Sequence, residues 1–270
     1  MEKIAIISDV HGNYTALQEV LNDIEKRGIK RIFCLGDMLV KCSSPKKCVE
    51  TILNRCEVVL MGNCESRATI TQLTDEHAWN GKMLSKELFD KVSKLPLSYD
   101  FYISGLKVRL MHASPFSIHE KSYYWDMTEG FDKRAIKMFE NTEYLNNIGQ
   151  DTPDVVIFGH IHRPFAYRSR PNKKLLINPG AVSNTSEIIN INRKDYTYGS
   201  YIILEGEFNS KEISSFSYEF VKFSYDNEKE ARNILETDMP NKEASAEEIL
   251  TGKYFDRKKL NQEAAAQWKK

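Results

Sequence analysis

Short apolar runs recur along the first two thirds of the chain and alternate with amphipathic stretches. The first run, KIAIIS at 3–8, has no polar alternation, which is typical of a strand buried on both faces. Further strands are predicted at 31–35, 57–61, 106–111, 154–158 and 173–178, and alternating strands are predicted around 196–205 and 212–222.

Helices are predicted between the early strands. Apolar side chains at helical spacing predict one helix in the stretch 13–28, with Asn13 as its N-cap and Gly28 at its end. A second helix is predicted at about 45–54. Strands that alternate with helices in this way indicate a layered α/β fold.

The predicted strands end in polar residues of a few types. Within a few residues, five strands are followed by two aspartates, one asparagine and four histidines. These residues are Asp9 and His11, then Asp37, Asn63, His112, and finally His160 and His162. Ligand sites in layered α/β folds gather outside the carboxyl ends of the strands. We therefore expect these seven side chains to meet at one edge of the sheet.

The seven side chains offer only oxygen and nitrogen ligands. Imidazole mixed with carboxylate suits Mn²⁺, Fe or Zn²⁺ better than it suits Ca²⁺. Seven ligands are too many for one tetrahedral ion, but they fit two ions that share one carboxylate. Two ions roughly 3.5–4 Å apart lower the pKa of a bridging water and hold both the attacking and the leaving oxygen of a phosphoryl group.

The blocks that carry these residues resemble the calcineurin-like metallophosphoesterases in order and spacing. They are DVH at 9–11, GD at 36–37, GNCE at 62–65, His112 within MHASP, and GHIH at 159–162. NPGAV at 178–182 is similar to a segment of the small bacterial phosphodiesterase branch. The resemblance covers about residues 3–205 and implies a four-layer α/β/β/α sandwich with a binuclear metal site.

The resemblance also implies how two ions share the seven ligands. One ion would be bound by Asp9, His11, Asp37 and His162, and the other by Asp37, Asn63, His112 and His160. Asp37 would bridge the two, and Asp37, Asn63 and His112 are the implied catalytic residues. The implied reaction is in-line attack on phosphorus by a metal-bridging hydroxide. Mn and Fe are the expected ions, with Zn, Ni and Mg left open.

Cys64 departs from many relatives, which have a histidine at this position. A neutral thiol is a poor substitute for an imidazolium, so Cys64 is interpreted as a small half-buried thiol rather than as a general acid or a nucleophile. An alkoxide leaving group needs a proton in the transition state, whereas a phosphate leaving group does not. Phosphodiesters and phosphoanhydrides are therefore the expected substrates, including nucleotides and dinucleoside polyphosphates such as diadenosine tetraphosphate.

Two other functions stay open at this stage. LMGNCESR at 60–67 is similar to the LRGNHESR block of serine/threonine protein phosphatases, but Met61 and Cys64 replace its arginine and histidine. The Asp-Arg-Gly that follows GD in that family is missing as well. A non-catalytic scaffold, like the retromer subunit of this fold, would act through surface contacts. The complete set of seven ligands favours the enzyme.

The segment at about 113–152 is predicted to be an inserted helical cap. It is rich in aromatic residues, among them Phe116, Tyr124 and Phe131, which form either the core of the cap or a lid on which a nucleobase stacks. The candidate substrate contacts are Lys41, Cys64, Arg67, His119, Tyr123, Trp125 and Arg163. The alternative for the charged residues is solvated surface, and for His119 it is a structural role.

From about residue 226 the composition shifts to Glu, Lys and Ala. We predict a metallophosphoesterase domain at 1–222 and a C-terminal helical extension at 223–270, packed outside that domain. The extension shows no site of its own, which leaves solvated surface or a homo-oligomer contact as its role.

The totals for the chain bear on its partners and location. Lys+Arg and Asp+Glu are both 38, so the net charge gives no electrostatic argument for an extended nucleic acid as partner. No apolar run approaches the length of a membrane helix, and the N-terminus turns polar too early for a signal peptide. The five cysteines form no CxxC. A cytoplasmic protein with a small phosphorylated substrate is the simplest interpretation.

Overall fold

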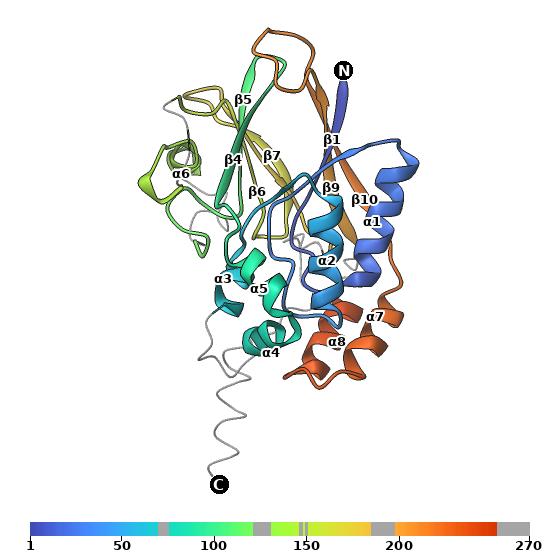
Figure 1. Ribbon diagram of the computed structural model, residues 1–270. Helices are drawn as coiled ribbons and strands as arrows, with labels where there is room; N and C mark the ends of the chain where they lie inside the picture. The colour runs from blue at the N-terminus through green and yellow to red at the C-terminus, as the bar shows by residue number, and fades with distance from the viewer. Residues whose placement is uncertain (70–75, 121–130, 146–147, 149–150, 185–197, 253–270) are drawn as a thin grey trace.

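The apolar runs of the sequence form two five-stranded sheets (Figure 1). The computed structural model describes residues 1–69, 76–120, 131–145, 148, 151–184 and 198–252. Strand order is β10-β9-β1-β2-β3 in the first sheet and β4-β5-β6-β8-β7 in the second.

The first sheet combines parallel and antiparallel pairs. Its strands are β1 (Glu2–Ile7), β2 (Arg31–Cys34), β3 (Val58–Val59), β9 (Gly199–Gly206) and β10 (Ser217–Phe223). β1 runs parallel to β2 and antiparallel to β9, so that Ile6 lies opposite both Phe33 and Ile202. The helices α1 (Tyr14–Lys26) and α2 (Pro45–Arg55) connect the parallel strands. As predicted, Asn13 caps α1, because its side chain accepts the N–H of Ala16 at 2.9 Å.

The second sheet contains two strands that the sequence analysis did not predict. Its strands are β4 (Ser98–Ile103), β5 (Leu106–Met111), β6 (Val155–Phe158), β7 (Pro164–Arg168) and β8 (Leu175–Pro179). The two unpredicted strands, β4 and β7, are the edges of this sheet. Most of their residues are only half-buried, so they lack the continuous apolar run of a central strand.

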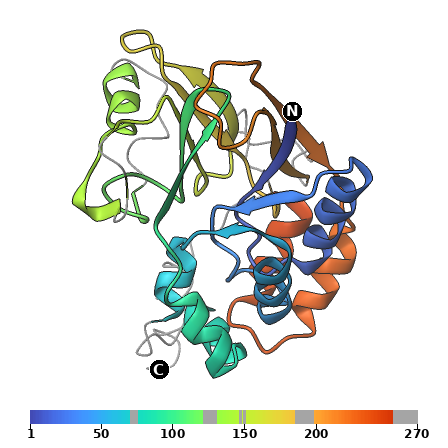
Figure 2. The same ribbon diagram turned by 45° about the horizontal axis from the view of Figure 1, so that its top comes forward.

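Three apolar clusters hold the layers together. Ile6 and Val108 belong to the cluster between the two sheets, whereas Ile7 points to the other face of the first sheet and packs with α1 and α2. The third cluster joins Phe158 in the second sheet to Phe131 in α6 (Phe131–Lys137). Figure 2 shows these layers side by side, from α6 across both sheets to α1. The predicted four-layer α/β/β/α sandwich is confirmed.

The described helix of the predicted insertion is therefore the outer layer of the second sheet. Phe131 is buried, and its ring meets that of Tyr167 edge to face, with centroids 4.7 Å apart. Of the two alternatives for Phe131, the position of its ring fits packing in the core rather than a stacking lid. Tyr123, Tyr124 and Trp125 lie outside the described residues.

The remaining helices lie at the end of the molecule to which β1 and β2 point (Figure 1). They are α3 (Asn63–Ala68), α4 (Glu76–Met83), α5 (Lys86–Val92), α7 (Asn227–Leu235) and α8 (Lys242–Thr251); the short 3₁₀ turn η1 (Glu143–Leu145) follows α6. α7 and α8 belong to the C-terminal extension, and the predicted division at residue 222 stays a prediction. None of the described helices is long and apolar enough to cross a membrane.

The second sheet buries a charged pair that gives a test of its packing. Arg109 on β5 is fully buried and donates from Nε and Nη2 to the two carboxylate oxygens of Asp100 on β4, both at 2.8 Å. Asp100→Ala leaves this guanidinium without its carboxylate. We expect the free energy of unfolding to fall by about 3–5 kcal/mol, measured by urea denaturation. As a control, Asp90→Ala, which breaks an exposed pair with Lys86, should not change the urea midpoint. Equal midpoints for the two variants would contradict this account.

Candidate metal centre

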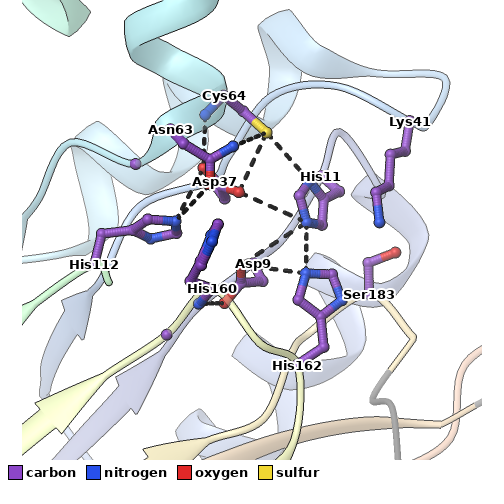
Figure 3. A network of polar contacts seen from close by, with 12 residues as sticks. Asp9, His11, Asp37, Lys41, Asn63, Cys64, His112, His160, His162 and Ser183 are labelled. Atoms are coloured by element: carbon purple, nitrogen blue, oxygen red, sulfur yellow. Dashed lines mark hydrogen bonds and ion pairs between the residues drawn. The ribbon is translucent and has the colours of Figure 1, made fainter. Parts of the chain in front are cut away.

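All seven predicted ligands meet in one polar network at the ends of the strands (Figure 3). Three overlapping groups of possible ligands occur among the described residues, and within each the ligand atoms lie within 4.8 Å of one another. Two of them consist of predicted metal ligands alone: a first group of Asp9, His11 and His162, and a second group of Asp37, His112 and His160. The third, His11 with Asp37 and Cys64, connects the other two.

Asp37 lies between the two groups. Its Oδ1 is 3.4 Å from Nε2 of His112, and its Oδ2 is 3.9 Å from Nε2 of His11. One carboxylate thus faces a histidine of each group, which is the geometry of a bridging ligand. This position fits the expectation that Asp37 is a ligand of both metal ions.

In the first group two imidazole nitrogens approach closely. Nε2 of His11 lies 2.9 Å from Nε2 of His162, and Oδ1 of Asp9 lies 3.3 Å from the latter and 3.8 Å from the former. The other oxygen of Asp9, Oδ2, accepts the backbone N–H of His160 at 3.0 Å. Asp9 therefore also links the first group to the turn that carries the histidines of GHIH.

Asn63 completes the second group. The end of its amide that faces the group lies 2.6 Å from Nδ1 of His160, 3.1 Å from Nε2 of His112 and 3.3 Å from Oδ2 of Asp37. The oxygen of Asp37 carries lone pairs, and so do the two ring nitrogens when they are deprotonated, as metal binding requires. An amide oxygen in this position fits a cation held among the four atoms, which is the ligand role predicted for Asn63.

Hydrogen bonds behind the histidines fix their tautomers. Nδ1 of His11 donates to the carbonyl oxygen of Leu39 at 3.1 Å, and Nδ1 of His112 donates to that of Leu35 at 2.9 Å. The Nε2 atoms of these rings therefore present lone pairs to the centre when the rings are neutral. Histidines that bind metals typically donate such a hydrogen bond from the ring nitrogen that does not face the metal.

The backbone of the site is strained in a way that the sequence did not reveal. Five of the seven predicted ligands have positive φ angles, between 52° and 71°: Asp9, His11, Asp37, His160 and His162. Non-glycine residues rarely adopt this conformation, and such residues cluster at functional sites, where each costs about 1–3 kcal/mol. The positive φ angles thus fall in the turns that follow β1, β2 and β6 and carry these five ligands.

The electrostatics of the buried groups match a site for cations. Burial acts to raise the pKa of Asp37, but the neighbouring histidines, His112 foremost, hold it well below its usual range. Burial acts to lower the pKa of His112, but Asp37 raises it to about 9. For His11, burial and the charge of Lys41 lower the pKa to about 3. Ionised carboxylates beside imidazoles thus occupy a region without solvent, and the donor set fits two metal ions.

Cys64 orients the bridging carboxylate. Its backbone N–H donates to Oδ1 of Asp37 at 2.8 Å, and its thiol donates to Oδ2 at 3.2 Å. Burial and the charge of Asp37 raise the pKa of the thiol well above its usual value. Cys64 is therefore a neutral, buried hydrogen-bond donor, and its interpretation as a half-buried thiol underestimated both its burial and its contact with Asp37.

Glu65 is a structural residue of the site that the sequence analysis did not assign. Its carboxylate is fully buried and accepts four backbone N–H groups, from Asp37, Met38, Leu39 and Gly62, at 2.8–3.1 Å. The signal in the sequence was the glutamate at the third position of α3, whose side chain accepts the N–H of Gly62 as in one half of a capping box. Glu65 thus joins the turn that carries Asp37 to the turn that carries Asn63.

Asn178 in NPGAV has a similar structural role. Its Nδ2 donates to the carbonyl oxygens of Phe158 and Gly159 at 2.6 and 2.7 Å, which fixes the turn before His160. A Cβ on Gly159 would overlap the hydroxyl of Ser8 and lie 2.8 Å from Oδ2 of Asp9. The first glycine of GHIH therefore permits the close approach of the two sheets at the site.

The described candidate substrate contacts lie around the same centre. Lys41 follows the turn of Asp37 and forms an ion pair with Glu248 of α8. His119 lies 3.3 Å from the hydroxyl of Ser66, on α3, the helix that also carries Arg67. Arg163 directly follows GHIH and is half-buried. Substrate binding by these residues stays a prediction.

A family model described as the calcineurin-like phosphoesterase superfamily domain matches residues 2–205. The chain belongs to the calcineurin-like phosphoesterase superfamily. The chain is 30% identical over 258 residues to the uncharacterized protein MJ0912 of Methanocaldococcus jannaschii, with 88% of this chain and 93% of that protein covered.

Two solved structures share the fold of this phosphoesterase. A metallophosphoesterase from Sphaerobacter thermophilus matches with a TM-score of 0.68 at 20% identity, and 93% of this chain and 99% of that chain are covered. The hypothetical protein PH1004 from Pyrococcus horikoshii OT3 matches with a TM-score of 0.68 at 12% identity, over 94% and 100% of the two chains. Both likenesses support the four-layer fold.

The substitution Glu65→Gln tests whether the carboxylate of Glu65 holds the turns that carry Asp37 and Asn63 in place. The amide keeps the size of the side chain but turns an NH₂ group toward backbone N–H donors, so hydrogen bonds are lost. We expect the free energy of unfolding to fall by about 1–3 kcal/mol and the Mn²⁺ affinity to fall roughly 10–100-fold. Urea denaturation and equilibrium dialysis measure the two effects.

Glu87→Gln, at an exposed position of α5, serves as the control and should leave both quantities unchanged. Wild-type Mn²⁺ affinity in Glu65→Gln would contradict the role assigned to this carboxylate.

Proposed function

We propose that this protein hydrolyses phosphodiester or phosphoanhydride bonds with the help of two bound metal ions. The observation that supports the proposal most strongly is the position of Asp37, whose two oxygens face a histidine of each group. Superfamily membership supports a hydrolase of phosphoric esters. One ion would be held by Asp9, His11, Asp37 and His162, and the other by Asp37, Asn63, His112 and His160, with Mn and Fe as the preferred metals.

In this proposal the metal ions and the protein side chains contribute different parts of the reaction. When bound, two ions would supply an activated water and positive charge opposite the oxygens of the phosphoryl group. The chain sets the geometry: Cys64 orients the carboxylate of Asp37, and the carbonyl oxygens of Leu35 and Leu39 orient the rings of His112 and His11. Because these groups are held before substrate arrives, little reorganisation accompanies the reaction.

The protonation state of the Cys64 thiol indicates which class of leaving group the site suits. The thiol donates a hydrogen bond to Oδ2 of Asp37 and has a pKa well above its usual value, so it is a weak acid at neutral pH. A substrate whose leaving group is stable as an anion does not need this proton. This favours activated phosphodiesters and phosphoanhydrides, and we propose a nucleotide or a dinucleoside polyphosphate, such as diadenosine tetraphosphate, as the natural class of substrate.

The alternatives are less well supported. A serine/threonine protein phosphatase would have to protonate an alkoxide, and the thiol of Cys64 is poorly suited to that step. A non-catalytic scaffold would not need seven ligand side chains converging on Asp37 with strained backbone at five of them.

Rates across esters of graded leaving-group pKa test the proposal. With the Mn²⁺-loaded protein, we expect turnover of aryl phosphodiesters to fall as the leaving-group pKa rises. Alkyl monoesters should react at least about 100-fold more slowly than anhydrides, because general acid catalysis is worth about that factor or more. Steady-state kinetics measure the dependence, and equal rates for alkyl monoesters and anhydrides would contradict the proposed substrate class.

Two variants serve as controls for this series. Cys64→Ala should leave the dependence on leaving-group pKa unchanged, because the thiol transfers no proton. Asp37→Ala with an intact fold should abolish turnover, whereas full activity in that variant would contradict the assignment of the whole site.

A further inference from the structure

The C-terminal extension reaches the loop that follows Asp37. Nζ of Lys41 lies 3.2 Å from Oε1 of Glu248 on α8, and the two side chains are only 20% and 10% exposed. An ion pair shielded from solvent is screened less than an exposed one, so it holds both partners more firmly. The C-terminal extension was predicted to pack outside the main domain. Its helix α8 thus positions the ammonium group of Lys41, a residue that follows the predicted metal ligand Asp37 in the chain.

The charged end of Lys41 lies beside the metal centre. In Figure 3 it is on the same side of the network as His11 and Ser183. The loop that carries Lys41 is bonded to the turn of His11, because the N–H groups of His11 and Gly12 donate to the carbonyl oxygens of Asp37 and Met38 at 2.9 and 2.7 Å. The ammonium group therefore lies at the edge of the centre, in a position to meet an anion bound there.

The backbone at Lys41 is held in an unusual conformation. Val40 and Lys41 have φ angles of 74° and 79°. A β-branched residue with positive φ is a genuine outlier, and such strain persists only where the surroundings enforce it. Here the N–H of Val40 donates to Oδ1 of Asn80 at 2.9 Å, and the N–H of Cys42 donates to the carbonyl oxygen of His11 at 3.0 Å. The loop is thus fixed with Lys41 turned toward α8 and the centre.

A second acidic residue anchors the extension on the other side of this loop. Glu230 on α7 is fully buried; its Oε2 accepts the hydroxyl of Thr15 at 2.7 Å, and its Oε1 accepts the hydroxyl and N–H of Ser43 at 2.8 and 3.2 Å. On α8, the carbonyl oxygen of Glu248 accepts Nδ2 of Asn184 at 2.8 Å. These polar contacts dock the extension on segments that border the site.

We propose that α8 is part of the substrate-binding site: Glu248 holds Lys41 beside the metal centre, where the ammonium group binds a phosphate oxygen of the substrate. The inference rests on the proposed function and adds Glu248 as a positioning residue. Lysine suits this role because its ammonium has three donors, so it can bind Glu248 and a phosphate oxygen together. The C-terminal extension then contributes to recognition of the phosphate.

Binding of inorganic phosphate to the Mn²⁺-loaded full chain tests this proposal without turnover. Calorimetry should show that Lys41→Met raises the Kd for phosphate about tenfold or more, since a charge-assisted hydrogen bond is lost. Lys41→Arg should restore most of the affinity. Glu248→Gln should raise the Kd several-fold in the wild-type background but add nothing in the Lys41→Met background, because it acts through Lys41.

Glu247→Gln is the matched control, on the same helix but exposed, and it should bind phosphate like the wild type. The Mn²⁺ content of each variant is measured in parallel. The proposal is overturned if the wild type binds no phosphate, if Lys41→Met binds phosphate normally, or if Glu248→Gln weakens binding equally in both backgrounds. Phosphate binding through Lys41 in a protein that hydrolyses none of the esters would instead contradict the proposed function and support this inference.

Discussion

The carboxylate of Asp37 is oriented by two hydrogen bonds from Cys64 and carried on a turn whose three N–H groups bind Glu65. A buried charge of this kind is costly unless it is compensated. The compensation comes from the imidazoles on both sides, and bound cations would add to it. Because Asp37 faces a histidine of each group, a change in its position alters both halves of the centre at once.

The fold brings the two halves together across the sandwich. Asp9, His11, Asp37 and Asn63 follow strands of the first sheet, whereas His112, His160 and His162 follow strands of the second. The packing of one sheet on the other therefore sets the distances within the centre. Ions that bind only the native arrangement would in turn stabilise that packing by mass action, which couples the stability of the sandwich to metal binding.

Much of this arrangement was predictable because its signals are local. Central strands appear as apolar runs, Asn13 appears as a cap, and the ligands stand directly after strands. The edge strands β4 and β7 were missed because half-buried strands lack that signal.

Contacts between distant segments left no pattern in the sequence. The three bonds of Glu65 to the turn of Asp37, the positive φ angles of the ligands and the pair between Lys41 and Glu248 each depend on the fold as a whole. Consequently the sequence predicted which residues meet at the centre, but not what holds them or that α8 contacts the loop after Asp37.

Anomalous diffraction from crystals grown with Mn²⁺ tests the central claim most directly. This account predicts two peaks roughly 3.5–4 Å apart, with Asp37 between them. One ion should contact Asp9, His11 and His162, and the other should contact Asn63, His112 and His160. A single peak, or two peaks without Asp37 between them, would contradict the account.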